Sequence, residues 1–147
     1  MKKMFVLMLS CMIGIAAFAF NSGNVNETLL QSFKERFPHA EQVTWKESAE
    51  TYEVYFMEDG VRSNIVYDKD GVFRNATRYY KERNLPYYLL INIKKKYAGK
   101  KVYGITEIST PAGIEYYIKM EDAKVVTTIL VDADGSLSTY EKFRKAL

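Results

Sequence analysis

Apolar and polar residues alternate with a period of two along most of the chain after residue 40. In "TYEVYFM" (residues 51–57), Tyr52, Val54 and Phe56 fall on one face of an extended strand. Runs of this kind, separated by short segments with Gly, Pro or Asp, predict antiparallel strands. The expected strands are "QVTWKE", "TYEVYFM", "RSNIVYD" and "VFRNATRYY", followed by "VYGITEI", "GIEYYIKM", "KVVTTILVD" and "SLSTYEKF".

Two segments follow a helical period instead. The apolar residues of "NETLLQSFKERF" recur every three to four positions, which predicts an amphipathic helix. Asn26 is suited to cap its first turn, and Pro38 to end it. In "LPYYLLINIKKKYAGKK", Pro86 suits the first turn of a second helix and Gly99 its end.

The second helix and its strands repeat the plan of the first. Phe33 corresponds to Ile93 and Trp45 to Ile105 at the same offset. A unit of this size cannot bury its apolar face alone, so two units should share a core. We therefore expect an α+β fold: a tandem repeat of a helix plus a four-stranded antiparallel sheet, with the helices packed on one face. Within the units, Trp45 should face its helix, the alternative being a partly exposed position at a binding interface.

The expected boundaries follow from these units and from the first residues of the chain. "MKKMFVLMLSCMIGIAAFAF" has two lysines, an apolar run and "AFA", the order of a secretory signal peptide cleaved after Ala19. Lipidation at Cys11 is an alternative form of the same targeting. The boundaries are therefore a signal peptide at 1–19, a first repeat at 20–83 and a second at 84–147, both repeats forming one continuous structural domain.

Cleavage changes the composition of the chain. The mature protein expected after cleavage has no cysteine, no membrane span, and a formal net charge of +1 instead of +3, because Lys2 and Lys3 are removed. A nearly neutral protein is not expected to bind nucleic acid. The predicted location is the periplasm or the medium.

Four motifs of the first half resemble a known family. They are "RFPHA" at a helix end, "VTW", the strand "YEVYF" and "VYDKDG" before the last strand. The segment is similar to the PepSY-like family of β-lactamase-inhibitor-like (BLIP-like) secreted proteins of Bacteroidetes. The second half matches more weakly, because Tyr97-Ala98-Gly99 replaces the Phe-Pro pair and Ile105 the tryptophan. The resemblance implies helices on one face of an antiparallel sheet, and inhibition of a β-lactamase only as an analogy of fold.

Two Asp-x-Asp-Gly segments could be metal loops or turns. After Asp68 and after Asp132, glycine comes at the fourth position, whereas an EF-hand needs it at the sixth and a glutamate at the twelfth. Asp-Gly between alternating apolar runs instead predicts a hairpin turn. His39 is the only histidine, and no nucleophile, metal-ligand or phosphate-binding motif is present. We expect no enzyme, no catalytic residue, no metal and no cofactor.

The lysine run "KKKYAGKK" has two interpretations. The lysines could contact an anionic surface, or they could complement the dipole at the end of the second helix. The second is the simpler.

The tyrosines suggest a binding surface. If Val54 and Phe56 face the helix, Tyr55 faces away, as does Tyr117 in the second half. Tyr80 and Tyr140 could join them. The expected protein-binding face contains Tyr55, Tyr117, Arg74, Arg78, Lys46 and Lys119. Tyrosine and arginine are enriched at interfaces, although a solvated sheet face also carries tyrosines.

These features predict a secreted, periplasmic, non-enzymatic binding module that acts through the open face of its sheet. It could inhibit or modulate an envelope enzyme, with a periplasmic or envelope protein as partner. The alternative is a domain that senses a small ligand or the cell envelope.

Overall fold

The structure, a computed structural model, describes residues 25–146, so the expected signal peptide lies outside the described residues. The elements in chain order are α1 (Glu27–Arg36), β1 (Glu41–Glu47), β2 (Thr51–Glu58), β3 (Val61–Asp68), β4 (Phe73–Tyr80), the 3-10 turn η1 (Glu82–Asn84), α2 (Tyr87–Lys96), β5 (Lys101–Thr110), β6 (Gly113–Glu121), β7 (Val125–Val131) and β8 (Leu137–Arg144).

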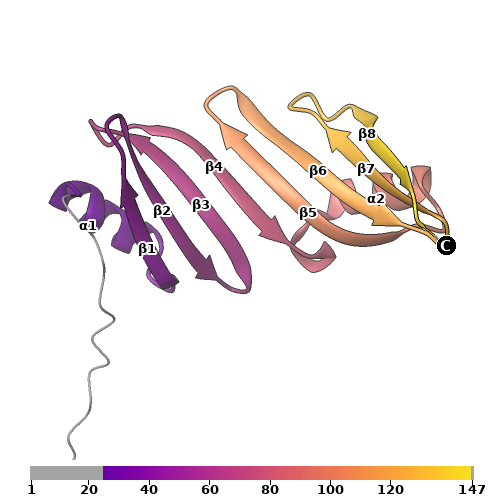
Figure 1. The fold of residues 1–147 in the computed structure, drawn as a ribbon, viewed down its shortest axis with the longest axis horizontal. Helices are drawn as coiled ribbons and strands as arrows, with labels where there is room; N and C mark the ends of the chain where they lie inside the picture. Colours follow the sequence, from indigo (N-terminus) through magenta and orange to yellow (C-terminus); the bar gives the residue numbers. More distant parts are fainter. Residues whose placement is uncertain (1–24, 147) are drawn as a thin grey trace, which may run out of the picture.

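All eight strands form one antiparallel sheet in the order of the chain (Figure 1). The predicted tandem repeat of a helix plus a four-stranded sheet is therefore wrong. The described part of the chain is mostly β, with two α-helices of ten residues each. Strand β4 pairs directly with β5, from Ala76 opposite Ser109 to Tyr80 opposite Ile105. This pairing satisfies the backbone groups that two separate sheets would leave on open edges.

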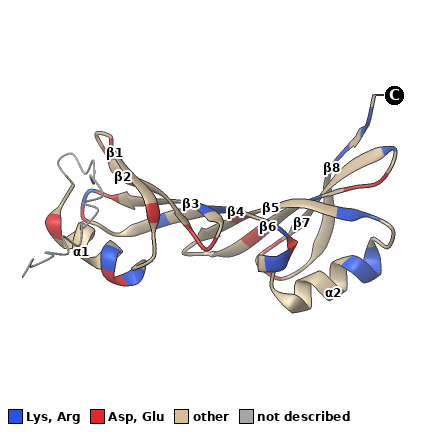
Figure 2. Ribbon diagram, turned by 90° about the horizontal axis from the view of Figure 1, so that it is seen from below, with Lys and Arg blue, Asp and Glu red and all other residues tan. Residues whose placement is uncertain are grey.

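Both helices lie on the same face of the sheet, one towards each end (Figure 2). The ends of the sheet rise on the opposite side, which we call the helix-free face. The helix starts follow local rules: the Asn26 side chain accepts a hydrogen bond from the Thr28 N–H, and Pro86 occupies the cap position of α2. The predicted helices are confirmed as local elements.

Aromatic side chains make the core beneath α1. Phe33 is 2% exposed, and its ring lies 5.4 Å from Trp45 and 5.1 Å from Phe56 in edge-on contacts. Such contacts stabilise beyond the area that they bury. Trp45 is buried among them, so the prediction that it faces the helix is confirmed.

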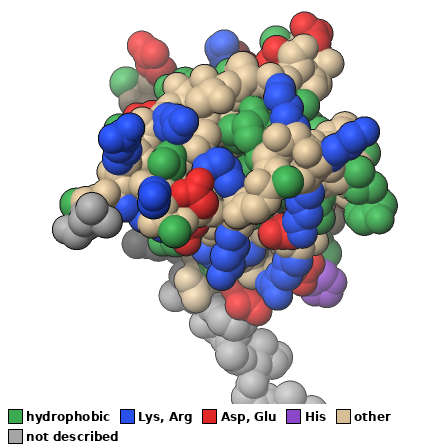
Figure 3. Space-filling model, turned by 90° about the vertical axis from the view of Figure 1, so that its right-hand side faces the viewer, with side chains coloured by type: hydrophobic (Ala, Val, Ile, Leu, Met, Phe, Trp, Pro, Cys, Tyr) green, Lys and Arg blue, Asp and Glu red, His purple; other side chains and the backbone are tan. Residues whose placement is uncertain are grey.

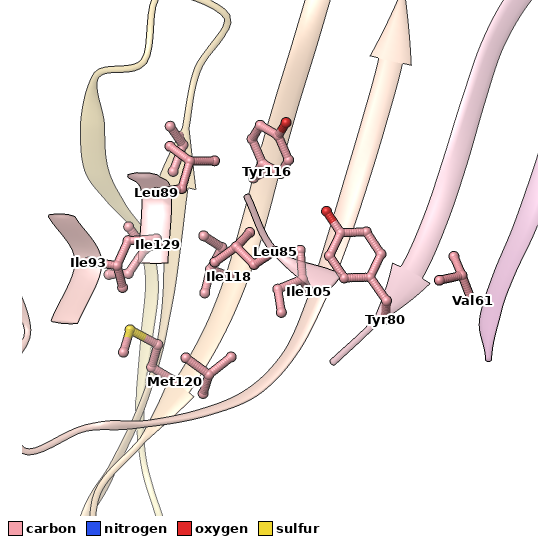
Figure 4. Close-up of a cluster of buried hydrophobic side chains, with 12 residues drawn as sticks. Val61, Tyr80, Leu85, Leu89, Ile93, Ile105, Tyr116, Ile118, Met120 and Ile129 are labelled. Carbon is pink, nitrogen blue, oxygen red and sulfur yellow. The ribbon is translucent and has the colours of Figure 1, made fainter. Parts of the chain in front are cut away.

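Aliphatic side chains dominate the core beneath α2 (Figure 4). Leu89 and Ile93 of the helix pack against Ile118 and Ile129 of the sheet, and Ile93, Ile118 and Ile129 are fully buried. The cluster extends across β4 to Val61, so it crosses the junction between the two halves of the sheet. Each helix thus covers its own end of the sheet.

The two Asp-Gly segments are turns, as predicted. Asp68 Oδ1 accepts hydrogen bonds from the backbone N–H groups of Asp70 and Val72, at 3.1 and 2.9 Å. Asp132 makes the equivalent pair of bonds in the second turn. The glycines that follow, Gly71 and Gly135, have φ of +80° and +82°, a conformation that glycine adopts without steric cost.

Replacing Gly71 by alanine is expected to lower the free energy of unfolding by about 1–2 kcal/mol, since a Cβ is disfavoured in the left-handed conformation. The position itself has room, because the nearest side-chain atom would lie 4.0 Å from the added Cβ. Gly104→Ala is the matched control: its φ is outside the left-handed region, and its added Cβ would meet an ordinary contact at 3.9 Å. Urea unfolding of both variants checks this, and equal losses would show that the turn conformation is not the cause.

Candidate functional site

Alternation along each strand decides which side chains reach the helix-free face. On β2, Tyr52, Val54 and Phe56 are buried on the helix side, and the residues between them are half-buried. On β6, Tyr116, Ile118 and Met120 are buried in the same way. The predicted outward positions of Tyr55 and Tyr117 follow from these two patterns.

Tyr55 is held by two neighbours on the helix-free face. Its hydroxyl donates a 2.6 Å hydrogen bond to Glu53 Oε2, and the Lys46 ammonium lies 4.8 Å from its ring centroid. The bond to Glu53, with some burial, raises the pKa of the Tyr55 hydroxyl. The hydroxyl thus donates to Glu53 while the ring lies beside a cation. The structure brings Lys46 and Tyr55 together.

Tyr117 makes a corresponding arrangement on β6. Its hydroxyl donates to Glu115 Oε2 at 3.2 Å, and its ring meets that of Tyr140 edge-on at 5.0 Å. Burial, followed by the Glu115 charge, raises the pKa of the Tyr117 hydroxyl. Tyr140 thus lies on the helix-free face, where it is 61% exposed. Lys119 extends from the same strand towards the ring of Tyr103, 5.9 Å away.

Arg78 does not lie on the helix-free face, contrary to the prediction. Arg78 alternates with the buried Ala76 and Tyr80, so all three point to the helix side. Arg78 pairs with the buried Glu107 of β5 at 3.1 Å, and this ion pair explains why a charged residue occupies that side. Tyr80, which was expected to join the outward tyrosines, is also buried there.

Arg74 lies at an irregularity in the pairing of β3 with β4. The register shifts there, so that Tyr67 pairs with Phe73. The Arg74 guanidinium contacts Asp68 Oδ2 at 3.2 Å, beside the turn. It belongs to the end of the hairpin rather than to the group around Tyr55 and Tyr117.

A shallow groove of about 670 Å³ crosses the helix-free face over β4, β5 and β6. It combines cations with aromatic rings: Arg62 stacks 4.8 Å from the Tyr79 centroid, and Lys81 lies 4.8 Å from that of Tyr103. Lys81 also donates to the Tyr103 carbonyl oxygen at 2.8 Å. The residues that define this cation–tyrosine groove are Arg62, Tyr79, Lys81, Tyr103, Tyr117 and Lys119.

Sequence reasoning missed Tyr103, which is 56% exposed. Strict alternation puts Tyr103 on the same side as the buried Ile105. The register of β5 with β6 shifts between Val102 and Gly104, and this bulge turns Tyr103 outward. The neighbouring Gly104 was the available signal, because a glycine inside a strand often marks a bulge.

The lysine run at the end of α2 is largely occupied within the chain. Lys94 pairs with Glu82, Lys96 Nζ donates to the Leu137 carbonyl at 3.1 Å, and Lys100 pairs with Asp122 at 2.5 Å. The Lys100 bond, together with two backbone N–H groups, holds the pKa of Asp122 well below its usual range. Figure 3 shows the lysines and arginines spread over this end of the molecule rather than gathered in one patch.

Residues 25–146 offer neither a metal cluster nor a membrane-spanning helix. No three or more His, Cys, Asp or Glu side chains gather there in an arrangement that could hold a metal ion. Among the helices of that part, none has the length and apolar character needed to cross a membrane.

Comparison with known proteins gives a likeness of fold. No protein-family model matches the chain, and no curated protein matches it. A BLIP-like protein from Bacteroides fragilis has a TM-score of 0.59 at 16% identity, covering 84% of this chain and 89% of its own. A DUF2874 family protein from Bacteroides ovatus has a TM-score of 0.57 at 16% identity, covering 84% of this chain and 89% of its own. A protein from Bacteroides eggerthii, named provisionally as periplasmic, has a TM-score of 0.56 at 13% identity, covering 83% of this chain and 90% of its own.

These neighbours share the fold of this chain over most of their length. The resemblance to BLIP-like proteins of Bacteroidetes that the sequence motifs indicated is therefore confirmed at the level of the fold.

Proposed function

We propose that this protein is a non-enzymatic binding module of the periplasm that binds a protein partner through its helix-free face. The observation that carries the proposal is the asymmetry of the sheet: both helices cover one side, and no described element covers the other. A sheet face of this extent needs neither a pocket nor a loop to present a contact surface.

The side chains on the helix-free face suit a protein partner. Tyr103 and Tyr140 are more than half exposed. Tyr117 lines the groove with Tyr103, and its ring contacts that of Tyr140. Tyrosine presents a large, rigid contact area with a polar end, and hot spots at interfaces are enriched in it. The adjacent cations, such as Lys119, favour partners with acidic groups at the contact.

Inhibition or modulation of an envelope enzyme is the finer form of this proposal. Its support is the name of one structural neighbour, a BLIP-like protein, together with the position of the open face. The periplasmic location rests on the order of residues 1–19 and on the name of another neighbour. Intact mass of protein from a periplasmic fraction tests it: loss of the first nineteen residues is expected, and a full-length cytosolic species contradicts it.

Truncation of Tyr55 or Tyr117 to alanine is expected to separate binding from folding. Each change should cost less than about 1 kcal/mol of folding free energy, because both side chains are only half-buried. Affinity for a partner captured from periplasmic extract should fall by about 2 kcal/mol or more if the residue is a hot spot. Titration and thermal melts of each variant give the two quantities.

Val54→Ala and Ile118→Ala are the matched controls from the same strands, since both side chains are fully buried on the helix side. They should lose about 1–5 kcal/mol of folding stability and keep their affinity per folded molecule. The proposal fails if the tyrosine variants unfold while their affinity per folded molecule stays unchanged.

A further inference from the structure

The helix side of the sheet has a hollow between α1 and α2. The two helices lie towards opposite ends, so part of the central strands β3, β4 and β5 lies between them on this side (Figures 1 and 2). The hollow has a volume of about 640 Å³, within the range of small-molecule sites. We call it the interhelix groove, and its walls include Arg36, Phe37, Phe56, Tyr67, Phe73 and Arg78.

Small side chains make the floor of the interhelix groove. Ser63 lies opposite Arg78 in the pairing of β3 with β4, and Ala76 lies opposite Ser109 in the pairing of β4 with β5. Large apolar residues at these positions would fill the space between the helices. Ile65, beside Ala76, adds an apolar surface to the same floor. The groove is therefore open because of the residues that the chain places there.

A buried polar network fixes one side of the groove. Glu107 is 6% exposed; its carboxylate accepts a 2.5 Å hydrogen bond from the Tyr80 hydroxyl and a 3.1 Å bond from Arg78 Nη1. Burial and this bond raise the pKa of Tyr80 far above its ordinary value, so the hydroxyl remains a donor. Glu107 thereby holds the Arg78 side chain, which is 45% exposed. A guanidinium has five N–H donors, and the Glu107 contact uses one.

A second guanidinium lines the interhelix groove from the end of α1. Arg36 forms no ion pair with any residue between 25 and 146, and its charge acts on the hydroxyl of Tyr67, which also lines the groove. The acidic residues in the walls are Glu107, already paired with Arg78, and Glu58, where β2 ends. Arg36 and the free N–H groups of Arg78 thus provide donors for an anion beside an apolar surface.

We propose that the interhelix groove binds a small amphipathic carboxylate, such as a medium-chain fatty acid. The carboxylate accepts hydrogen bonds from Arg78 and Arg36, and the alkyl chain lies over Ile65, Ala76 and the ring of Phe73. Guanidinium–carboxylate bonds are among the strongest in proteins because both partners are charged. A neutral apolar molecule of the same length makes no such bonds. This site is on the opposite side of the sheet from the proposed protein-binding face.

The test compares octanoate with octan-1-ol, which has the same alkyl chain without the charge, by calorimetric titration at neutral pH. Octanoate is expected to bind at least about tenfold more tightly than octanol, and Arg78→Gln to reduce octanoate affinity about tenfold or more. Ala76→Leu, which fills the floor, should abolish binding of both. Arg74→Gln is the matched control, because Arg74 lies at the hairpin end against Asp68.

Thermal melts of each variant first establish that it is folded. Absence of octanoate binding to the parent protein overturns the proposal, as does equal binding of octanol. Equal losses for Arg78→Gln and Arg74→Gln would also overturn it, because the effect would then be a general loss of surface charge.

Discussion

Replacing Phe33 by alanine is expected to lower the free energy of unfolding by about 3–5 kcal/mol, enough to unfold a marginal domain. The Phe33 ring is 2% exposed and contacts the rings of Phe37, Trp45 and Phe56 at centroid distances of 5.1, 5.4 and 5.1 Å. A cavity at this point removes the main contact of α1 with the sheet. Rigid aromatic neighbours cannot collapse into it fully, so the cost should fall in the upper part of the range for core truncations.

Urea unfolding followed by the fluorescence of Trp45 measures this directly, because the indole lies in the same cluster and is the only tryptophan of the chain. Ser32→Ala, one residue earlier on the exposed side of α1, is the control and should change stability by less than about 0.5 kcal/mol. A loss below 1 kcal/mol for Phe33→Ala would show that α1 does not depend on this cluster.

The second large effect is expected at Glu107. Glu107→Ala removes the acceptor of the buried Tyr80 hydroxyl and the partner of Arg78, and should cost about 2–4 kcal/mol. This expected cost is lower than that of breaking a fully buried ion pair, because Arg78 is 45% exposed and water screens its charge. Glu107→Gln keeps an acceptor for Tyr80 and should cost less.

A double-mutant cycle with Tyr80→Phe isolates the hydroxyl–carboxylate bond, and a coupling energy near zero would contradict this account. The pH dependence gives an independent check. Since the folded pKa of Tyr80 is raised, the folded state keeps a proton that the unfolded state releases above about pH 10. The stability that Tyr80 contributes through its raised pKa is therefore complete below about pH 10 and is lost as the pH rises further. Tyr80→Phe should weaken the loss of stability above pH 10.

Features set by neighbouring residues could be predicted from the sequence. Asn26 caps α1, and Asp68 and Asp132 hold their turns through bonds to the next few backbone N–H groups. The outward positions of Tyr55 and Tyr117 follow from the period of two in strands with strong apolar alternation.

Features set by distant residues could not be predicted. Nothing in β4 alone shows that its free edge pairs with β5, and this pairing turns the expected tandem units into one sheet. In β4, "FRNATRYY" has weak alternation, so the face of Arg78 depends on Glu107, which is twenty-nine residues away along the chain. The bulge at Tyr103 shifts the inward–outward alternation of β5 by one residue. The pattern of apolar and polar residues in the sequence does not reveal such a shift.

Site-specific photocrosslinking in the periplasm tests the central claim, that the helix-free face binds a protein, most directly. A photoreactive phenylalanine replaces Tyr103 or Tyr140 on that face, and Tyr87 or Ile91 as exposed controls on α2. The expected result is the same crosslinked partner from Tyr103 and Tyr140, with none from Tyr87 and Ile91. Crosslinks from the two α2 positions alone would place the partner on the helix side and contradict the claim.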